Sequence, residues 1–271
     1  MARKRKVVLV TGASSGIGLR SALRLIKDGH TVYGGARNTD AMAPIGAAGG
    51  KVLSLDVTDD ASMQQAIGTI AQAEGRLDVL VNNAGYGLYG AVEDTSMDVA
   101  RAQMEVNVFG LARMTQLALP LMRDAGKGTI INLSSMGGTI YMPLGAWYHG
   151  SKHFVEGFSD SLRLEVKQFG INVVLIAPGA IKTEFNSTMR DLVLQSSGNG
   201  AYSKLAELMA NAADPDRGSD PDVIADDISR AVKARKPKTR YRSGQMSVSL
   251  PRMRRMLSDR MFDRIIMSAI K

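Results

Sequence analysis

The residues best suited to chemistry are Tyr148 and Lys152, in the run YHGSK, with Ser135 thirteen residues upstream. Side chains four residues apart share one face of a helix. A free phenol has a pKa of about 10, and lowering it to about 7 takes roughly 4 kcal/mol. One ammonium about 4 Å away supplies that much at an effective dielectric constant of about 20. The pair predicts proton transfer to or from an oxygen atom that the Ser135 hydroxyl would hold.

A glycine-rich turn, TGASSGIG, begins at Thr11 and lies between a predicted strand and a predicted helix. There the helix amides and the positive end of the helix dipole can face an anion. Gly12 would allow the tight turn, Gly16 the approach of a pyrophosphate, and Gly18 close packing of the helix on the sheet. The spacing Gly-x3-Gly-x-Gly differs from the commoner dinucleotide fingerprint. A purely structural turn is therefore an alternative on this motif alone.

Two further features follow neighbouring predicted strands. Arg37 stands about 20 residues after the turn, where a cofactor ribose is expected. An arginine there attracts a 2′-phosphate, so NADP(H) is favoured over NAD(H); the alternative is an ordinary surface arginine, and nearby Asp40 complicates the prediction. The turn at 81–85 (VNNAG) reinforces the first one, because ligands of open α/β sheets bind at the carboxyl ends of the strands.

These residues need a sheet and helices to bring them together, and the pattern of the chain provides both. Short apolar, β-branched runs alternate with helical patterns, which is typical of a parallel sheet buried on both faces. We predict an α/β fold with a doubly wound, Rossmann-like sheet of about seven strands. The strands are expected at 7–10, 31–33, 52–55, 79–81, 129–133, 172–176 and 239–242. The helices are expected at 17–27, 62–73, 96–123, 148–168, 203–211 and 221–234.

Length and composition narrow the class of protein. A chain of 271 residues suits one large α/β domain, which we place at 1–250. The absence of cysteine excludes disulfides and thiolate sites and fits a cytoplasmic location. With only three histidines, we predict no metal. Residues 1–231 hold 22 Lys and Arg against 24 Asp and Glu, whereas 232–271 hold 12 against 2. The basic tail lacks the stacking aromatics of a nucleic-acid site, so no nucleic acid is expected.

Taken together, the motifs resemble those of the short-chain dehydrogenase/reductase family, in its short single-domain form, from about residue 7 to about 234. The resemblance implies a catalytic tetrad of Asn107, Ser135, Tyr148 and Lys152, in which Asn107 holds a water that links Lys152 to solvent. Ser134 is the neighbour that Ser135 must be distinguished from, and the spacing to Tyr148 favours Ser135. The implied cofactor-binding residues are Gly12, Ser14, Ser15, Gly16, Ile17, Gly18, Arg37, Asp56, Val57, Asn83, Ala84, Gly85, Tyr148, Lys152, Pro178, Gly179, Ile181 and Thr183.

The chain also departs from the family pattern. NADP binders of the family often carry a second basic residue in the glycine turn, whereas this chain has Ser14 and Ser15. A lid is expected at about 183–217, with a loop at 195–200. Large, mostly apolar residues predict a pocket for a hydrophobic ketone, aldehyde or secondary alcohol, although each could instead belong to the core. They are Tyr86, Leu88, Met136, Tyr141, Trp147, Phe185, Met189 and Leu192.

The tail at 251–271 is predicted to form one basic amphipathic helix. Docking on the body is favoured; a subunit interface or peripheral contact with an anionic membrane are the alternatives. The resemblance implies a homodimer or homotetramer. Two functions stay open: an NADP(H)-dependent oxidoreductase, which is favoured because the tyrosine and lysine are both present, and a non-catalytic NADP-binding sensor or scaffold of the same fold.

Overall fold

A seven-stranded parallel sheet forms the centre of the molecule in the computed structural model, which describes residues 5–212 and 218–270. The strand order is β3-β2-β1-β4-β5-β6-β7, and neighbouring strands pair in parallel throughout. From β1 the chain adds strands toward one edge of the sheet, and from β4 it adds them toward the other edge. The gap between β1 and β4 is therefore the switch point at which open α/β sheets bind ligands. The strands are β1 (Val7–Thr11), β2 (Thr31–Ala36), β3 (Lys51–Ser54), β4 (Val79–Asn82), β5 (Gly128–Leu133), β6 (Ile171–Ile176) and β7 (Arg240–Tyr241).

Each central strand contributes to two cores because its side chains alternate between the two faces of the sheet. In β1, Val8 and Val10 join one hydrophobic cluster and Val7 and Leu9 join the other. All of β1 is buried, as expected of a strand covered on both faces.

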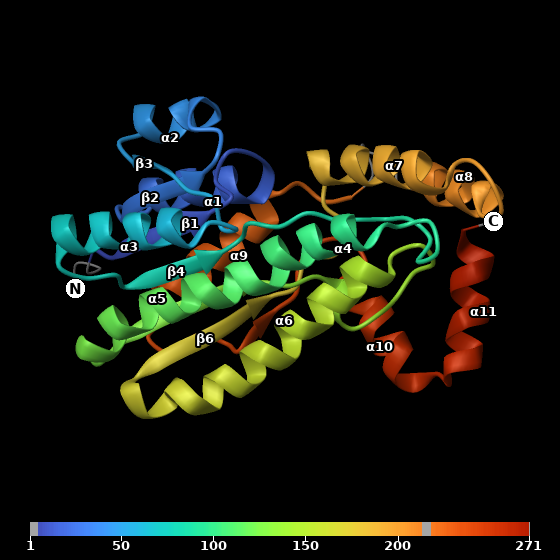
Figure 1. Cartoon of the computed structure of the whole chain (residues 1–271). Coiled ribbons are helices and arrows are strands. Elements are labelled where there is room, and N and C mark those ends of the chain that lie inside the picture. Colours follow the sequence, from blue (N-terminus) through green and yellow to red (C-terminus); the bar gives the residue numbers. More distant parts are fainter. Residues whose placement is uncertain (1–4, 213–217, 271) are drawn as a thin grey trace.

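Helices cover both faces of the sheet (Figure 1). On one side lie α1 (Gly16–Lys27), α2 (Ala43–Ala47) and α9 (Asp222–Lys233). On the other lie α3 (Asp60–Glu74), α5 (Leu111–Asp124) and α6 (Ala146–Glu165), with α4 (Met97–Met104) leading into α5. The predicted doubly wound α/β fold is confirmed.

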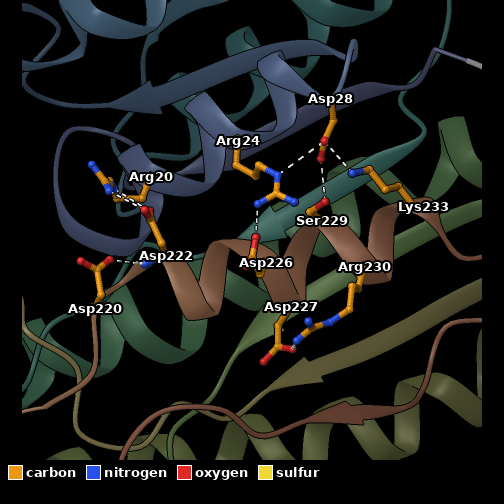
Figure 2. Close-up of polar contacts among 10 residues, drawn as sticks. All are labelled: Arg20, Arg24, Asp28, Asp220, Asp222, Asp226, Asp227, Ser229, Arg230 and Lys233. Carbon is orange, nitrogen blue, oxygen red and sulfur yellow. Dashed lines mark hydrogen bonds and ion pairs between the residues drawn. The ribbon is translucent and has the colours of Figure 1, made fainter.

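Polar contacts join α1 to α9, although some 200 residues separate them in the sequence (Figure 2). Arg20 forms two hydrogen bonds with Asp222, at 2.6 and 2.5 Å. Asp28, at the end of α1, accepts a hydrogen bond from Ser229 at 2.6 Å and lies 2.5 Å from the Lys233 ammonium. These contacts hold α1, the helix that follows the glycine turn, against α9.

The helix predicted at 96–123 is interrupted. Between α4 and α5 the chain makes a π-helical turn, η2 (Glu105–Gly110), which contains Asn107. Such turns insert a residue into the helix and often lie at functional sites. Sequence periodicity does not reveal the turn because the apolar pattern continues through it.

Two other predictions need correction. The loop predicted at 195–200 begins later, because α7 (Glu184–Ser197) extends through 195–197 before α8 (Ser203–Ala212). The tail predicted as one helix is two, α10 (Ser249–Met256) and α11 (Asp259–Ala269). Leu257 and Ser258 are extended between them, and a serine followed by an aspartate is a typical helix start. The part of the predicted lid at 213–217 lies outside the described residues.

The tail docks on the body of the protein. Phe262 and Ile266 of α11 are buried against Ile140, and Ile270 packs with α7 and α8. Figure 1 shows α10 and α11 in red, with the end of α11 beside α8. Within the described ranges, no helix is both long and apolar enough to cross a bilayer.

Candidate active site

The glycine turn has little spare room. Gly12 has φ +63°, which an L side chain rarely adopts. A Cβ on Gly18 would lie 2.1 Å from the Gly12 carbonyl oxygen. The turn is tied to the end of β4, because the Asn83 amide donates to the Thr11 and Gly12 carbonyls at 2.9 and 3.0 Å. Both predicted turns therefore form one surface at the carboxyl edge of the sheet, beside the N-terminus of α1.

A cleft of about 1150 Å³ opens above this surface. It brings together most of the residues singled out in the sequence and runs from the ends of β2 and β3 to α6 and α7. Of the predicted catalytic and cofactor-binding residues, the cleft is lined by Gly12, Ser14, Ser15, Gly16, Ile17, Gly18, Arg37, Asp56, Val57, Asn83, Ala84, Gly85, Ser135, Tyr148, Lys152, Pro178, Gly179, Ile181 and Thr183.

Tyr148 lies in the first turn of α6 and faces Ser135 across the cleft. The two hydroxyls interact, and Ser135 also accepts a hydrogen bond from the Gly137 amide at 3.0 Å. The neighbouring Ser134 hydroxyl instead donates to Glu156 at 2.5 Å. The geometry thus separates the two serines and gives Ser135 the position beside the phenol.

Burial dominates the acidity of Tyr148. It raises the pKa of the phenol to about 12, against the lowering effect of the Ser135 hydrogen bond. The Lys152 ammonium lies 5.9 Å from the centre of the Tyr148 ring. The expected fall of the phenol pKa toward 7 is therefore absent from this arrangement.

Lys152 is buried one turn further along α6. Its ammonium donates to the Leu133 carbonyl at 2.8 Å. Burial lowers the pKa of this lysine to about 8, against the opposing effect of Glu156. Lys152 still lines the cleft, beside the turn after β4, where a Cβ on Gly85 would lie 3.8 Å from its ammonium.

Asn107 lies behind the cleft and does not line it. Its side-chain amide donates to the Tyr86 carbonyl at 2.9 Å and to the Ser151 hydroxyl at 3.1 Å, and its oxygen accepts from the Tyr86 amide at 3.0 Å. The same oxygen would be 2.9 Å from a Cβ on Gly85. Asn107 thereby connects the π-helical turn, the loop after β4 and α6.

His149, next to Tyr148, lines the cleft but was not singled out in the sequence. Burial lowers the pKa of this histidine to about 4, against the effect of its bond to Gly137. Nδ1 is 3.0 Å from the Gly137 carbonyl, and Nε2 accepts from the Met142 amide at 3.0 Å. A neutral ring protonated on Nδ1 satisfies both contacts. His149 holds the loop after Ser135 on α6, a role that only the folded contacts reveal.

Arg37 is exposed at the end of β2 and lies near Asp56, whose pKa it helps to lower. In Asp56, burial acts to raise the pKa, but the amide and hydroxyl of Thr58 and the charge of Arg37 bring it below its ordinary value. Asp40 is exposed at the start of the short helix η1 (Asp40–Met42) and does not line the cleft. The cleft edge at this end therefore carries an exposed guanidinium near one carboxylate.

The predicted substrate residues divide into two groups. Tyr86, Met136, Phe185, Met189 and Leu192 line the cleft, whereas Tyr141, Trp147 and Leu88 do not. The Tyr141 ring packs on Phe262 and its hydroxyl donates to Asp263, so it belongs to the docked tail. Leu88 is core. Residues missed in the sequence include Tyr89, Ile140 and Met142, which also line the cleft.

The family profile described as short chain dehydrogenase matches residues 6–192, which is more than two thirds of the chain. The chain belongs to the short-chain dehydrogenase/reductase family. Its match therefore covers the glycine turn, the turn after β4, and the residues Ser135, Tyr148 and Lys152.

Individual relatives agree with this assignment. The chain is 38% identical to the 3-ketodihydrosphingosine reductase of Bacteroides thetaiotaomicron over 89% of this chain and 88% of the relative. A short-chain dehydrogenase from Streptomyces avermitilis has a similar structure, with a TM-score of 0.81, 35% identity and 92% coverage of both chains. An alcohol dehydrogenase from Thermococcus sibiricus, complexed with 5-hydroxy-NADP, has a TM-score of 0.73 at 25% identity, with 90% of this chain and 97% of that chain covered.

Proposed function

We propose that this member of the family is an NADP(H)-dependent oxidoreductase that interconverts a hydrophobic ketone or aldehyde and its alcohol. The observation that carries the proposal is the meeting of Ser135, Tyr148 and Lys152 in the same cleft as the glycine turn. The turn fits a dinucleotide because Gly12, Gly16 and Gly18 line the cleft at the start of α1 and carry no side chain. That leaves backbone amides at the N-terminus of α1 free to face a pyrophosphate.

The chain's own groups then handle the proton. A bound nicotinamide supplies or accepts a hydride at carbon. Tyr148, protonated at neutral pH, donates its proton to the carbonyl oxygen during reduction, while the Ser135 hydroxyl holds that oxygen. Lys152 stabilises the phenolate that this transfer leaves, and its charged form is available below about pH 8. In the oxidising direction the same groups act in reverse.

Arg37 supports the choice of NADP(H). It is the basic residue at the end of β2 that lines the cleft, and its exposed side chain can meet a 2′-phosphate. A bidentate contact between a guanidinium and a phosphate is a strong, charge-assisted one. The related alcohol dehydrogenase with bound 5-hydroxy-NADP agrees with this choice.

The other end of the cleft supports a hydrophobic substrate. Met136, Ile140, Met142, Phe185 and Met189 line it close to Ser135 and Tyr148. The relative named 3-ketodihydrosphingosine reductase acts, by that name, on a lipid ketone. A long-chain or polycyclic ketone is therefore our first candidate for the substrate class.

Self-association belongs to the same proposal. Members of the family commonly form oligomers. In this chain Phe109 is 56% exposed and Phe154 is 39% exposed, on the neighbouring segments η2 and α6. We infer that these faces pair with a second copy.

A substrate panel with NADPH and NADH tests the proposal by the change in nicotinamide absorbance. The wild type is expected to reduce hydrophobic ketones with a kcat/KM for NADPH at least tenfold that for NADH. Arg37→Glu should lower this preference at least tenfold, because a hydrogen bond between charged groups contributes about 1.5–3 kcal/mol. Arg101→Glu, on the exposed face of α4, is the matched control and should leave it unchanged.

The alternative is a non-catalytic sensor. It would gain support if NADPH bound tightly while no carbonyl or alcohol in the panel changed the absorbance. Equal use of both cofactors by the wild type and Arg37→Glu would contradict the cofactor assignment alone.

A further inference from the structure

A second pocket lies apart from the cleft, between the end of β7 and α10. It has a volume of about 370 Å³ and shares no lining residue with the cleft. Six residues line it, and four are arginines: Arg240, Arg242, Arg252 and Arg255, with Val248 and Pro251. Nothing in the proposed hydride transfer uses this pocket.

One of the four arginines is neutralised by carboxylates. Arg240 donates to Glu156 at 2.6 and 2.9 Å and to Asp160 at 3.2 Å. Among residues 5–212 and 218–270, the other three have neither an ion pair nor a side-chain hydrogen bond. Arg242 is half-buried, whereas Arg252 and Arg255 are exposed on α10.

Within the described part of the chain, the fold therefore gathers three arginines with which no carboxylate pairs. Burial is the main cause that lowers the pKa of Arg242, followed by the charge of Arg240; Glu156 opposes them, and Arg255 and Arg252 add to them. Arg252 and Arg255 are three residues apart and so lie on one side of α10. Like charges held together in a part-buried pocket raise the free energy of the folded state unless an anion joins them.

We propose that Arg242, Arg252 and Arg255, which we call the arginine pocket, bind a phosphate group. A guanidinium presents a planar pair of donors that matches two phosphate oxygens. Three such groups suit an anion with several oxygens and more than one negative charge better than a single carboxylate. The volume exceeds that of one phosphate and leaves room for the group that carries it.

The phosphate can belong to a soluble ester or to the headgroup of an anionic lipid. Val248 is 38% exposed and Met256 is 84% exposed, on the segment that carries the arginines. Exposed apolar groups beside arginines are also found on surfaces that lie against a bilayer. The chemistry of recognition is the same for both sources, so the experiment must separate them.

The test compares three full-length proteins. The pocket variant combines Arg242→Gln with Arg255→Gln. The control combines Arg260→Gln with Arg264→Gln, which removes the same charge from exposed positions of α11. The cleft, whose glycine turn also offers amides to a phosphate, is identical in all three and contributes equally.

The first readout is calorimetric titration with inorganic pyrophosphate. We expect the wild type and the control to bind pyrophosphate at a site that the pocket variant lacks or binds at least tenfold more weakly. Equal binding by all three proteins would overturn the proposal.

The second readout is thermal unfolding at low salt, which also shows whether the variants fold. Without phosphate the melting temperature of the pocket variant should equal or exceed that of the wild type, because the substitutions remove repulsion among the arginines of the pocket. Added pyrophosphate should then raise the melting temperature of the wild type more than that of the variant. A variant that melts well below the wild type without phosphate would mean that the arginines stabilise the fold directly, and would count against the proposal.

The third readout identifies the source of the phosphate by cosedimentation with vesicles of phosphatidylglycerol in phosphatidylcholine. Selective loss of vesicle binding by the pocket variant would assign a lipid headgroup. Pyrophosphate binding without vesicle binding would assign a soluble phosphate ester. If both variants bound vesicles equally weakly and their pyrophosphate titrations were unchanged, vesicle binding would depend only on the general positive charge of the tail. That result would contradict a phosphate site in the arginine pocket.

Discussion

At the scale of single residues, the site depends on how burial and charge act on Tyr148 and Lys152. The Lys152 ammonium lies 5.9 Å from the centre of the Tyr148 ring. Burial among Tyr89, Phe185 and His149 raises the pKa of the phenol and keeps it protonated. In this state Tyr148 suits the proton donor that carbonyl reduction requires.

The same burial makes Lys152 the group that titrates near neutral pH. Its pKa is lowered to about 8, so the charged form is lost as the pH rises through that value. We expect kcat/KM for NADPH, which reports groups of the free enzyme, to be level below about pH 8 and to fall above it. A pH profile from 6 to 10 would show this. Lys152→Arg, which stays charged, should lack the decline, and a wild-type profile that stays level to pH 10 would contradict the assignment.

The sequence predicted which residue types meet in the cleft but not every neighbour. Tyr148 and Lys152 could be found because helix geometry places positions four apart on one face. The position of Tyr141 outside the cleft could not be predicted, because its ring packs on Phe262, which is more than a hundred residues away in the sequence. The role of His149 depends in the same way on a loop contact with Met142.

At the scale of elements, strands were easier to predict than helix ends. A buried parallel strand leaves a β-branched apolar run that can be read locally, as in β1 and β6. The π-helical turn at Asn107 leaves no such mark, and contacts with the Tyr86 backbone hold it. The break at Leu257 is marked only by the pair Ser258-Asp259, a typical helix start, and Leu257 packs with the cluster around Phe262.

The contact between α1 and α9 makes a prediction at this scale. For Asp28, burial acts to raise the pKa, but Lys233, Ser229 and Arg24 hold it below its ordinary value. Asp28→Asn should lower the free energy of unfolding by about 2 kcal/mol at pH 7, since it leaves a largely buried lysine without its partner. Chemical denaturation measures this value.

The pH dependence of unfolding tests whether the charge of Asp28 is the cause of this stabilisation. Because the folded pKa of Asp28 is lowered, its stabilisation is complete above about pH 4, the unfolded value, and is lost as the pH falls through the folded pKa. The gap between the wild type and Asp28→Asn should therefore narrow below pH 4. Asp124→Asn, an exposed carboxylate beside Arg123, is the control and should change stability by less than about 0.5 kcal/mol. A gap that stayed constant through acid would contradict the ion pair as the cause.

At the scale of the whole molecule, the docked tail forms a support for the substrate end of the cleft. Phe262 and Ile266 pack on Ile140, with Met136 and Met142 against the same cluster, and these three residues also line the cleft. The basic charge of the tail was evident from the sequence. Its docking position was not, because an amphipathic pattern does not specify which surface its apolar side covers.

Removing the anchor of the tail should therefore affect both stability and substrate binding. Phe262→Ala is expected to cost about 3 kcal/mol of unfolding free energy and to raise KM for a hydrophobic ketone, while KM for NADPH stays close to the wild-type value. Met256→Ala, at a position 84% exposed, should change neither. Denaturation and steady-state kinetics on the same preparations provide both readouts. If Phe262→Ala were destabilised but its KM for the ketone were unchanged, the tail would not support the substrate end of the cleft.

The central claim is that Tyr148 transfers the proton during hydride transfer in this cleft. Tyr148→Phe removes only the hydroxyl. A single-turnover measurement with NADPH and a reducible ketone, alongside a direct titration of NADPH binding, separates chemistry from binding. We predict a fall in the hydride-transfer rate of about 10²–10⁴-fold with NADPH affinity within about threefold of the wild type. A variant that retained more than a tenth of the wild-type rate, with NADPH bound equally well, would contradict the account.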